Sequence, residues 1–216
     1  MTRKLIVPVA FLFVGLGAGA QTLFEGRKVT VIQPETDPDG FFPKGPASVC
    51  IEAPPQRQCY TAPQGFGIDP VARVVQVTKD MSALFFSVAS GGVSGRQIQF
   101  ALLQPGKGKD LGDLFASDVS VSNQNQHVFW NAPAISDAQI FVTAEYVWGP
   151  DEAHYDAHRF IISAYVLKNS SMLGDTRYFL EDRFMTARKY DQENDDILAA
   201  EKTEILTRLG RLRTAK

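Results

Sequence analysis

The chain has 216 residues, of which 22 are Lys or Arg and 24 are Asp or Glu, so its formal net charge is −2 with neutral histidine. Proteins that bind nucleic acid carry clustered Lys and Arg, and this balance therefore excludes nucleic acid as an expected partner. Hydrophobic residues make up 44% of the chain, which is enough to fill the core of one globular domain.

Residues 1–20 have the pattern of a signal peptide. Arg3 and Lys4 form a basic start, residues 5–17 are apolar, and residues 18–20 (AGA) are the small residues that precede a cleavage site. We expect cleavage near Ala20 and export to the periplasm or the extracellular space. The apolar stretch is shorter than the roughly 20 residues that cross a bilayer, and no later stretch is longer, so no membrane span is expected in the mature chain. Cleavage leaves 20 basic against 24 acidic residues, a net charge of about −4.

The two cysteines, Cys50 and Cys59, both lie in the predicted mature chain, with eight residues between them. In an exported protein such a pair is expected to form a disulfide. A metal site needs more ligands than two sulfurs, and a CxxC redox pair needs a shorter spacing. The sequence therefore predicts a structural disulfide that joins two short neighbouring strands.

Residues 21–46 contain one predicted strand, at residues 28–32 (KVTVI). The stretch that follows, PETDPDGFFPKGP, is rich in proline, glycine and acidic residues, so we expect an extended loop rather than part of a sheet. Its Phe41 and Phe42 either pack on the core or mark an exposed contact.

Residues 47–190 are predicted to form an antiparallel β domain. Short runs rich in Val, Ile and aromatic residues are separated by turn-forming residues, which is typical of a β-sandwich or a barrel. Residues 110–117 are ambiguous, with one helical turn as the favoured interpretation, and residues 177–190 read as a strand or a tight hairpin. The other strands predicted after the cysteines are 72–78, 82–89, 96–104, 118–122, 126–130, 139–149 and 158–168.

The hairpin of residues 139–149 and 158–168 is predicted to lie at the centre of the sheet. Alternate residues of a strand share a face, and both faces of each run are largely apolar, so both should be covered. Covered central strands hold the loop between them firmly, which favours that loop as a place for a functional site. In the first run one face carries Ile140, Val142, Ala144, Tyr146 and Trp148, and the other carries Phe141, Thr143, Glu145 and Val147.

Residues 191–216 are predicted to form one amphipathic helix packed on the β domain. Apolar residues recur there at near-helical spacing. Asn194 is the expected N-cap, with Asp195 and Asp196 in the first turn, and this charge arrangement complements the helix dipole. The apolar stripe covers the sheet or, alternatively, docks on a partner. The stripe consists of Leu198, Ile205, Leu209 and Leu212, widened by Ile197 and Leu206.

The loop at residues 149–158 holds the candidate site. Asp151, His154 and His158 could ligate a divalent metal such as zinc, because three nitrogen or oxygen ligands plus water are the minimum for a catalytic zinc site. The alternative is a solvated loop whose imidazoles and acids pair locally, and this is the favoured interpretation. Trp148 and Tyr155, with Trp130, could present aromatic faces to a sugar or peptide, although aromatic residues more often fill a core. The candidate ligand-binding residues are Trp148, Asp151, Glu152, His154, Tyr155 and His158.

The sequence predicts no catalytic residue, since it contains neither a GxSxG nucleophile motif nor a phosphate-binding glycine loop. The favoured hypothesis is an exported, non-catalytic binding or interaction module for a protein, peptide or carbohydrate, without a cofactor. The first alternative is a metal-dependent hydrolase that uses Asp151, His154 and His158. The second is a structural envelope component that assembles through the C-terminal helix.

Overall fold

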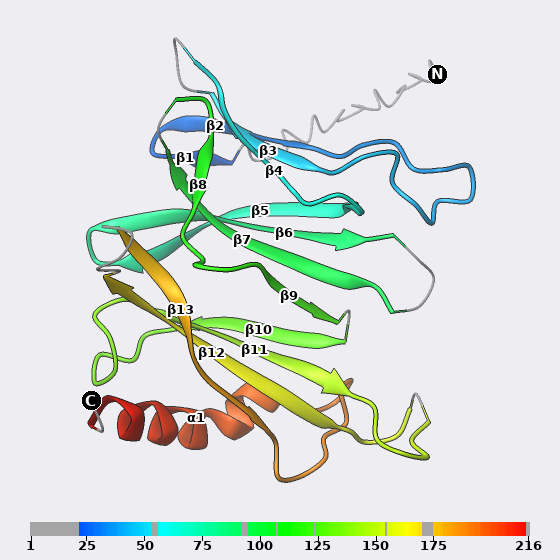
Figure 1. Cartoon of the computed structure of the whole chain (residues 1–216), viewed down its shortest axis with the longest axis vertical. Coiled ribbons are helices and arrows are strands. Elements are labelled where there is room, and N and C mark those ends of the chain that lie inside the picture. The colour runs from blue at the N-terminus through cyan, green and yellow to red at the C-terminus, as the bar shows by residue number, and fades with distance from the viewer. Residues whose placement is uncertain are drawn as a thin grey trace, which may run out of the picture.

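A computed structural model describes residues 22–52, 56–91, 95–106, 108–122, 124–153, 155–169 and 175–214. The predicted signal peptide and His154 lie outside these residues. The predicted fold class is confirmed: the chain is mainly β, with antiparallel sheets and one helix at its C-terminal end (Figure 1). In the part of the chain that the structure describes, no helix is long and apolar enough to cross a membrane.

The strands form three antiparallel sheets. The first sheet has the order β1-β2-β3-β4, with bounds Leu23–Phe24, Arg27–Ile32, Ser48–Ile51 and Gln58–Thr61. The second has the order β5-β6-β7-β8, with β9 also paired to β7, and its bounds are Phe66–Thr78, Met81–Ser90, Gln97–Pro105, Leu111–Asp113 and Val119–Ser122. The third has the order β10-β11-β12-β13, with bounds Asn125–Trp130, Ile140–Val147, Arg159–Asn169 and Thr176–Met185.

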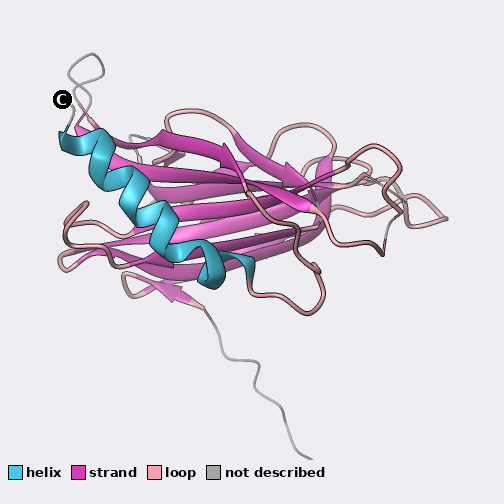
Figure 2. Cartoon of the chain, turned by 90° about the horizontal axis from the view of Figure 1, so that it is seen from below, coloured by secondary structure: helices cyan, strands magenta, loops and turns pink. Residues whose placement is uncertain are grey.

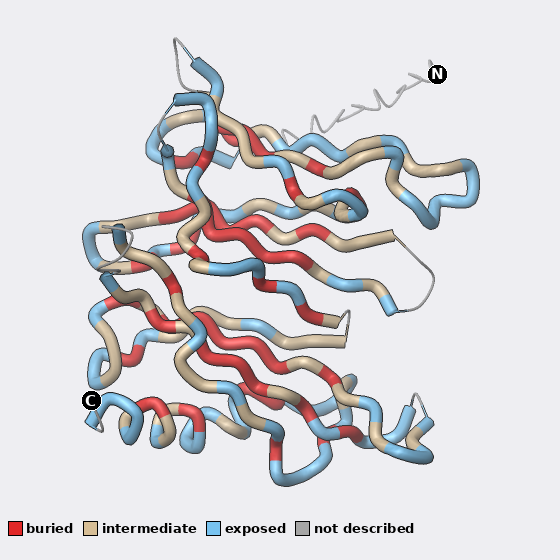
Figure 3. The backbone as a smooth tube through the Cα atoms, viewed as in Figure 1, coloured by how far each residue is buried: buried red, intermediate tan, exposed pale blue. Residues whose placement is uncertain are grey.

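The sheets are stacked, and the helix α1 (Ile197–Thr214) forms a fourth layer (Figures 1 and 2). The alternation of side chains along β6 and β7 explains the stacking. Leu84, Phe86 and Leu103 point into a core shared with the first sheet. Phe85 and Phe100 point to the opposite side, into a core shared with the third sheet. The central strands β6 and β7 are therefore buried on both faces, and the tube coloured by burial is red along much of their length (Figure 3).

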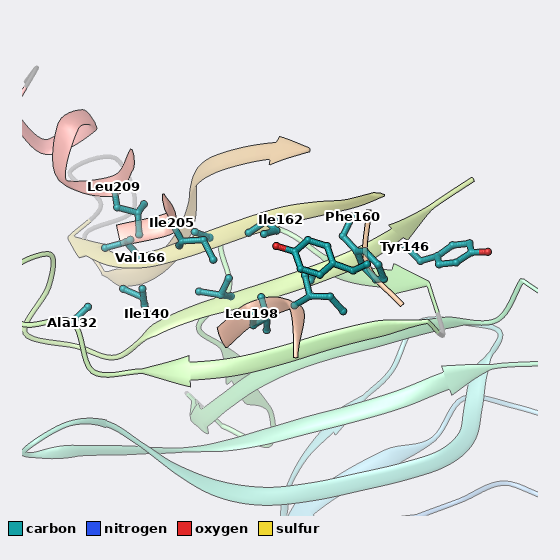
Figure 4. Packing of buried hydrophobic residues seen from close by; sticks show 14 residues of the cluster. Ala132, Ile140, Tyr146, Phe160, Ile162, Val166, Leu198, Ile205 and Leu209 are labelled. Atoms are coloured by element: carbon teal, nitrogen blue, oxygen red, sulfur yellow. The ribbon is translucent and has the colours of Figure 1, made fainter. Parts of the chain in front are cut away.

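The predicted central hairpin is β11 and β12, and both of its faces are covered as expected. Ile140, Val142 and Ile162 face α1, whereas Phe141 faces the middle sheet. Figure 4 shows the first of these cores, where Ile205 and Leu209 of α1 lie over Ile140, Ile162 and Val166. A strand with a nearly continuous apolar sequence is typically buried on both faces. Here α1 covers one face of β11 and β12, and the middle sheet covers the other.

Helix α1 buries most of the predicted stripe: Ile197, Leu198, Ile205 and Leu209 are buried, whereas Leu212 is exposed. The predicted N-cap is wrong by two residues. Asp196 caps the helix, because its Oδ1 accepts the backbone N–H of Ala199 at 2.9 Å. Asn194 instead donates its side-chain amide to Asp191, in the turn that precedes the helix.

The predicted disulfide between Cys50 and Cys59 is present, and the two residues are direct partners on β3 and β4 with Cα atoms 4.1 Å apart. The predicted extended loop folds back on itself, with Thr36 and Pro43 forming an isolated antiparallel bridge. Phe41 and Phe42 lie in it with 41% and 61% of their surface exposed, so they are exposed rather than core residues.

The helical turn predicted at 110–117 is wrong. Residues Leu111–Asp113 form β8, which pairs with β7. The reason is long-range: Asp113 accepts the backbone N–H groups of Leu102 and Phe115 on Oδ1, both at 3.0 Å, and so fixes the segment against β7. Burial raises the pKa of this carboxyl group to about 6 despite the two hydrogen bonds.

Candidate functional site

The loop that joins β11 to β12 is ordered by its own acidic side chains. Gly149 donates its backbone N–H to Oε2 of Glu152 at 2.7 Å, and Ala153 donates its own to Oδ2 of Asp156 at 2.6 Å. Asp151 lies at the tip with a φ of 61°, in the left-handed region that a short polar residue tolerates. A side chain at Gly149 would overlap the carboxyl group of Glu152, because an added Cβ would lie 2.5 Å from Cδ.

His158 is the centre of a hydrogen-bond chain beneath this loop. Its side chain is fully buried, and Nδ1 donates to Oε2 of Glu152 at 2.6 Å. In the neutral ring, Nε2 then accepts the hydroxyl proton of Tyr146 at 3.0 Å. The backbone of His158 also exchanges two hydrogen bonds with Tyr190, at 2.9 and 2.7 Å. The imidazole is therefore held on both ring nitrogens and through its backbone.

Glu152 carries the negative charge of this chain. Its Oε1 pairs with Nζ of Lys189 at 2.6 Å, although only 10% of the Glu152 side chain is exposed. The hydrogen bond from Lys189 is the largest of the contributions that hold the pKa of Glu152 at about 2, followed by those from Gly149 and His158. Burial and the nearby charge of Glu152 raise the pKa of Tyr146, so its hydroxyl stays protonated at neutral pH.

Of the residues in the predicted site, the structure brings together Glu152 and His158 and leaves Asp151 exposed. Tyr146 and Lys189, which were not part of the predicted site, also contact this pair. Both ring nitrogens of His158 are engaged, so a metal ligated by this ring would have to displace Tyr146 or Glu152. Among the described residues, no group of three His, Cys, Asp or Glu side chains could hold a metal ion. The metal site with His154 stays a prediction, since His154 lies outside those residues.

Two of the predicted ligand-binding residues, Trp148 and Tyr155, are 57% and 88% exposed. Trp130 does not join them in one aromatic surface. It pairs with Ile140 at the start of β11, whereas Trp148 follows the end of that strand. Eight residues of strand separate the two positions by about 26 Å.

The pKa of Glu152 predicts a pH dependence of folding. A carboxyl group with a lowered pKa in the folded state stabilises the fold above its unfolded pKa of about 4.5, and this contribution is lost as the pH falls to about 2. We expect Glu152→Gln to have a lower Tm than the parent protein at pH 7, and the difference to shrink between pH 4.5 and 2. Thermal unfolding followed by circular dichroism across pH 2–7 measures it.

The matched control is Asp151→Asn, which removes the neighbouring charge without touching the contacts to Gly149, His158 and Lys189. Its Tm should follow the parent protein at every pH. An equal Tm for Glu152→Gln and the parent at pH 7 would contradict the structural role of this ion pair.

A second region, which no motif in the sequence marks, lies along β10. This strand forms one edge of the third sheet. The backbone N–H of Tyr146 donates to the carbonyl of Gln124, and in an antiparallel ladder such bonded pairs alternate. The backbone groups of Gln126, Val128 and Trp130 therefore point to β11, and those of Asn125, His127 and Phe129 point outward. No backbone hydrogen bond between described residues joins that outer side to another segment.

The other long edge strands carry features that discourage further pairing, and β10 carries none. Strand β5 contains Pro70, and its pairing with β6 shifts register at three points. Strand β13 contains four charged residues and a register shift opposite Ala164 and Tyr165, and its Tyr178 bonds to the segment after β8. The sequence of β10, NQHVFW, has an unbroken register and neither proline nor a charged side chain. Natural proteins protect exposed edges in these ways, so an unprotected edge is unusual.

A hollow of about 670 Å³ lies between β10 and the N-terminal part of α1. Residues from both faces of β10 line it, with Asn125 and His127 on one face and Gln126, Val128 and Trp130 on the other. Residues 192–196, which precede α1, form the opposite wall. The side chain of Gln126 bridges the two walls, with Nε2 donating to the carbonyl of Asp195 at 2.8 Å and Oε1 accepting from Leu198 at 3.3 Å.

A further hollow has a volume of about 400 Å³. It lies between the loop before β11, the C-terminal end of β12, the first half of β13 and the C-terminal part of α1. Three of its four charged lining groups already bind each other or the backbone. Lys168 pairs with Glu181, and Arg213 donates to the carbonyls of Ala134 and Ile135 at 3.0 and 2.6 Å. The hollow beside β10 is thus the larger of the two and the one that borders unpaired backbone.

No family model, no curated protein sequence and no solved structure matches this chain.

Proposed function

We propose that this protein is an exported, non-catalytic interaction module that binds an extended polypeptide segment as an additional strand on β10. One observation carries the proposal: β10 is an unprotected sheet edge beside a hollow of about 670 Å³. A segment added there gains main-chain hydrogen bonds from Asn125, His127 and Phe129, and the hollow receives alternate side chains. The disulfide supports export, because such bonds persist in oxidising compartments.

Two other functions are weaker. A metal-dependent hydrolase at residues 151–158 would have to use His158, whose ring nitrogens already bind Tyr146 and Glu152. An envelope component that assembles through α1 would need an apolar face on the helix, but its stripe is buried against the third sheet. The observations favour neither of them over strand addition.

The test uses a synthetic pool of seven-residue peptides, acetylated and amidated, that alternate Val, Ile or Phe with Ser, Thr or Gln. We expect saturable shifts of the backbone amide signals of Asn125, His127 and Phe129 in ¹⁵N NMR spectra, with Trp148 and its loop unaffected. His127→Pro should lower the affinity roughly tenfold or more, because it removes one outward N–H and places a ring on the edge.

The matched control is His127→Thr, which also removes the imidazole but keeps the backbone donor, and its affinity should stay near that of the parent protein. Both variants should keep the parent's far-ultraviolet circular dichroism. The proposal fails if the pool leaves the three amides unchanged at millimolar concentration. It also fails if the protein sediments as a dimer that His127→Pro converts to a monomer, since a second copy then fills the edge. Turnover against a hydrolase panel that one substitution abolishes would support an enzyme instead.

A further inference from the structure

We infer that the segment bound on β10 is basic, with a Lys or Arg side chain at the Asn125 end of the strand. The inference rests on the proposed function and specifies the chemistry of its ligand. Three acidic residues line that end of the hollow, and Lys202 is the one cation among its described lining residues. The acidic residues are Glu193, Asp195 and Asp196.

The three carboxylates differ in how far they are already engaged. Asp196 caps α1 through Ala199, and Asp195 accepts the backbone N–H of Asp191 at 2.9 Å. Neither carboxylate forms a salt bridge with a described residue, although the charge of Asp195 does act on Arg188. Glu193 is exposed, and in the described part of the chain its carboxylate forms no salt bridge. A guanidinium or ammonium group of the ligand would supply the missing positive charge.

The other end of the hollow favours a different side chain. The ammonium group of Lys202 lies 5.1 Å from the centre of the Trp130 ring, so a basic ligand residue there would meet a like charge. His127 adds no positive charge at neutral pH, because burial and the nearby Arg73 lower the pKa of its imidazole below the usual 6.5. Trp130 and Val128 are partly buried apolar residues, so an apolar ligand side chain fits this end.

Gln126 and Trp130 are four positions apart, which corresponds to about 13 Å along the strand. The ligand therefore has an apolar side chain and a basic side chain four residues apart, which places both on the face toward α1.

The test uses three peptide pools of the same design as before, each with a fixed Val at one position. Four residues from this Val, the first pool carries Arg, the second Gln and the third Glu. We expect the Arg pool to bind roughly three- to tenfold more tightly than the Gln pool and the Glu pool to bind most weakly, with the differences decreasing at high salt. The shifts of the Asn125, His127 and Phe129 amides report the affinity in each case.

The matched variant is Glu193→Lys, which reverses one charge without removing the cap of α1 or the bond to Asp191. It changes the formal charge of the lining from −2 to 0, so the preference for the Arg pool over the Glu pool should largely disappear. Equal affinities for the three pools would overturn the basic ligand while leaving strand addition intact. An unchanged preference for Arg in Glu193→Lys would also overturn it, because these acids would then not be the cause. Absence of any shift on β10 would overturn the proposed function itself.

Discussion

Phe141→Ala is expected to lower the free energy of unfolding by about 3–5 kcal/mol, the range found when a fully buried aromatic side chain is truncated. Phe141 has no exposed surface and lies at the centre of the interface between the second and third sheets. Its ring centre is 4.8–5.9 Å from five other aromatic rings. They belong to Phe85, Phe100, Phe115, Phe129 and Tyr165.

The loss is large because five rings would face the resulting cavity, and strands from two sheets cannot both move inward to fill it. Urea unfolding followed by circular dichroism measures the change. Phe42→Ala, on a ring that is 61% exposed, is the matched control and should change stability by less than about 0.5 kcal/mol. A loss below about 1 kcal/mol for Phe141→Ala would mean that the two sheets do not pack on each other as described.

Removal of the disulfide is expected to have the second largest effect. Replacing Cys50 and Cys59 together by Ala should lower the free energy of unfolding by about 2–3 kcal/mol, because the unfolded chain regains the freedom that a closed loop of about ten residues had lost. The bond joins directly paired residues of β3 and β4, so the folded first sheet should keep its pairing without it.

Urea unfolding of the double variant, compared with the parent protein before and after reduction, measures this effect. The reduced parent and the double variant, which has no cysteine left to reduce, should have nearly the same midpoint. This comparison separates the loss of the cross-link from the loss of the two side chains. A parent protein whose midpoint does not respond to reduction would contradict the prediction.

The folded protein places its candidate sites at different positions on the same sheet. The Tyr146–His158–Glu152 chain lies where β11 ends and β12 begins, and the open edge of β10 runs along the neighbouring strand. The central hairpin that dominates the sequence is therefore a rigid support for both. Its own loop uses the polar side chains of Glu152 and His158 for internal bonds, whereas the outward backbone groups of β10 form no hydrogen bond with another described segment.

The sequence by itself determined those features that depend on short segments. The apolar runs of β11 and β12 predicted strands covered on both faces, the spacing of Leu198, Ile205 and Leu209 predicted the helix, and two cysteines in a chain with an export pattern predicted their disulfide. Side-chain periodicity follows directly from the geometry of a strand or helix, so it can be read locally.

Only the tertiary structure decided which strand is an edge and which polar groups meet. The run at 126–130 was predicted as a strand, but whether it has one neighbour or two depends on the pairing of distant segments. The sequence shows that this run has neither proline nor a charged residue. That composition indicates an unprotected edge only when the structure shows that the run is an edge strand. Likewise Lys189 reaches Glu152 from 37 positions away along the chain. Hydrogen-bond partners and open edges are set by long-range packing, which no local pattern encodes.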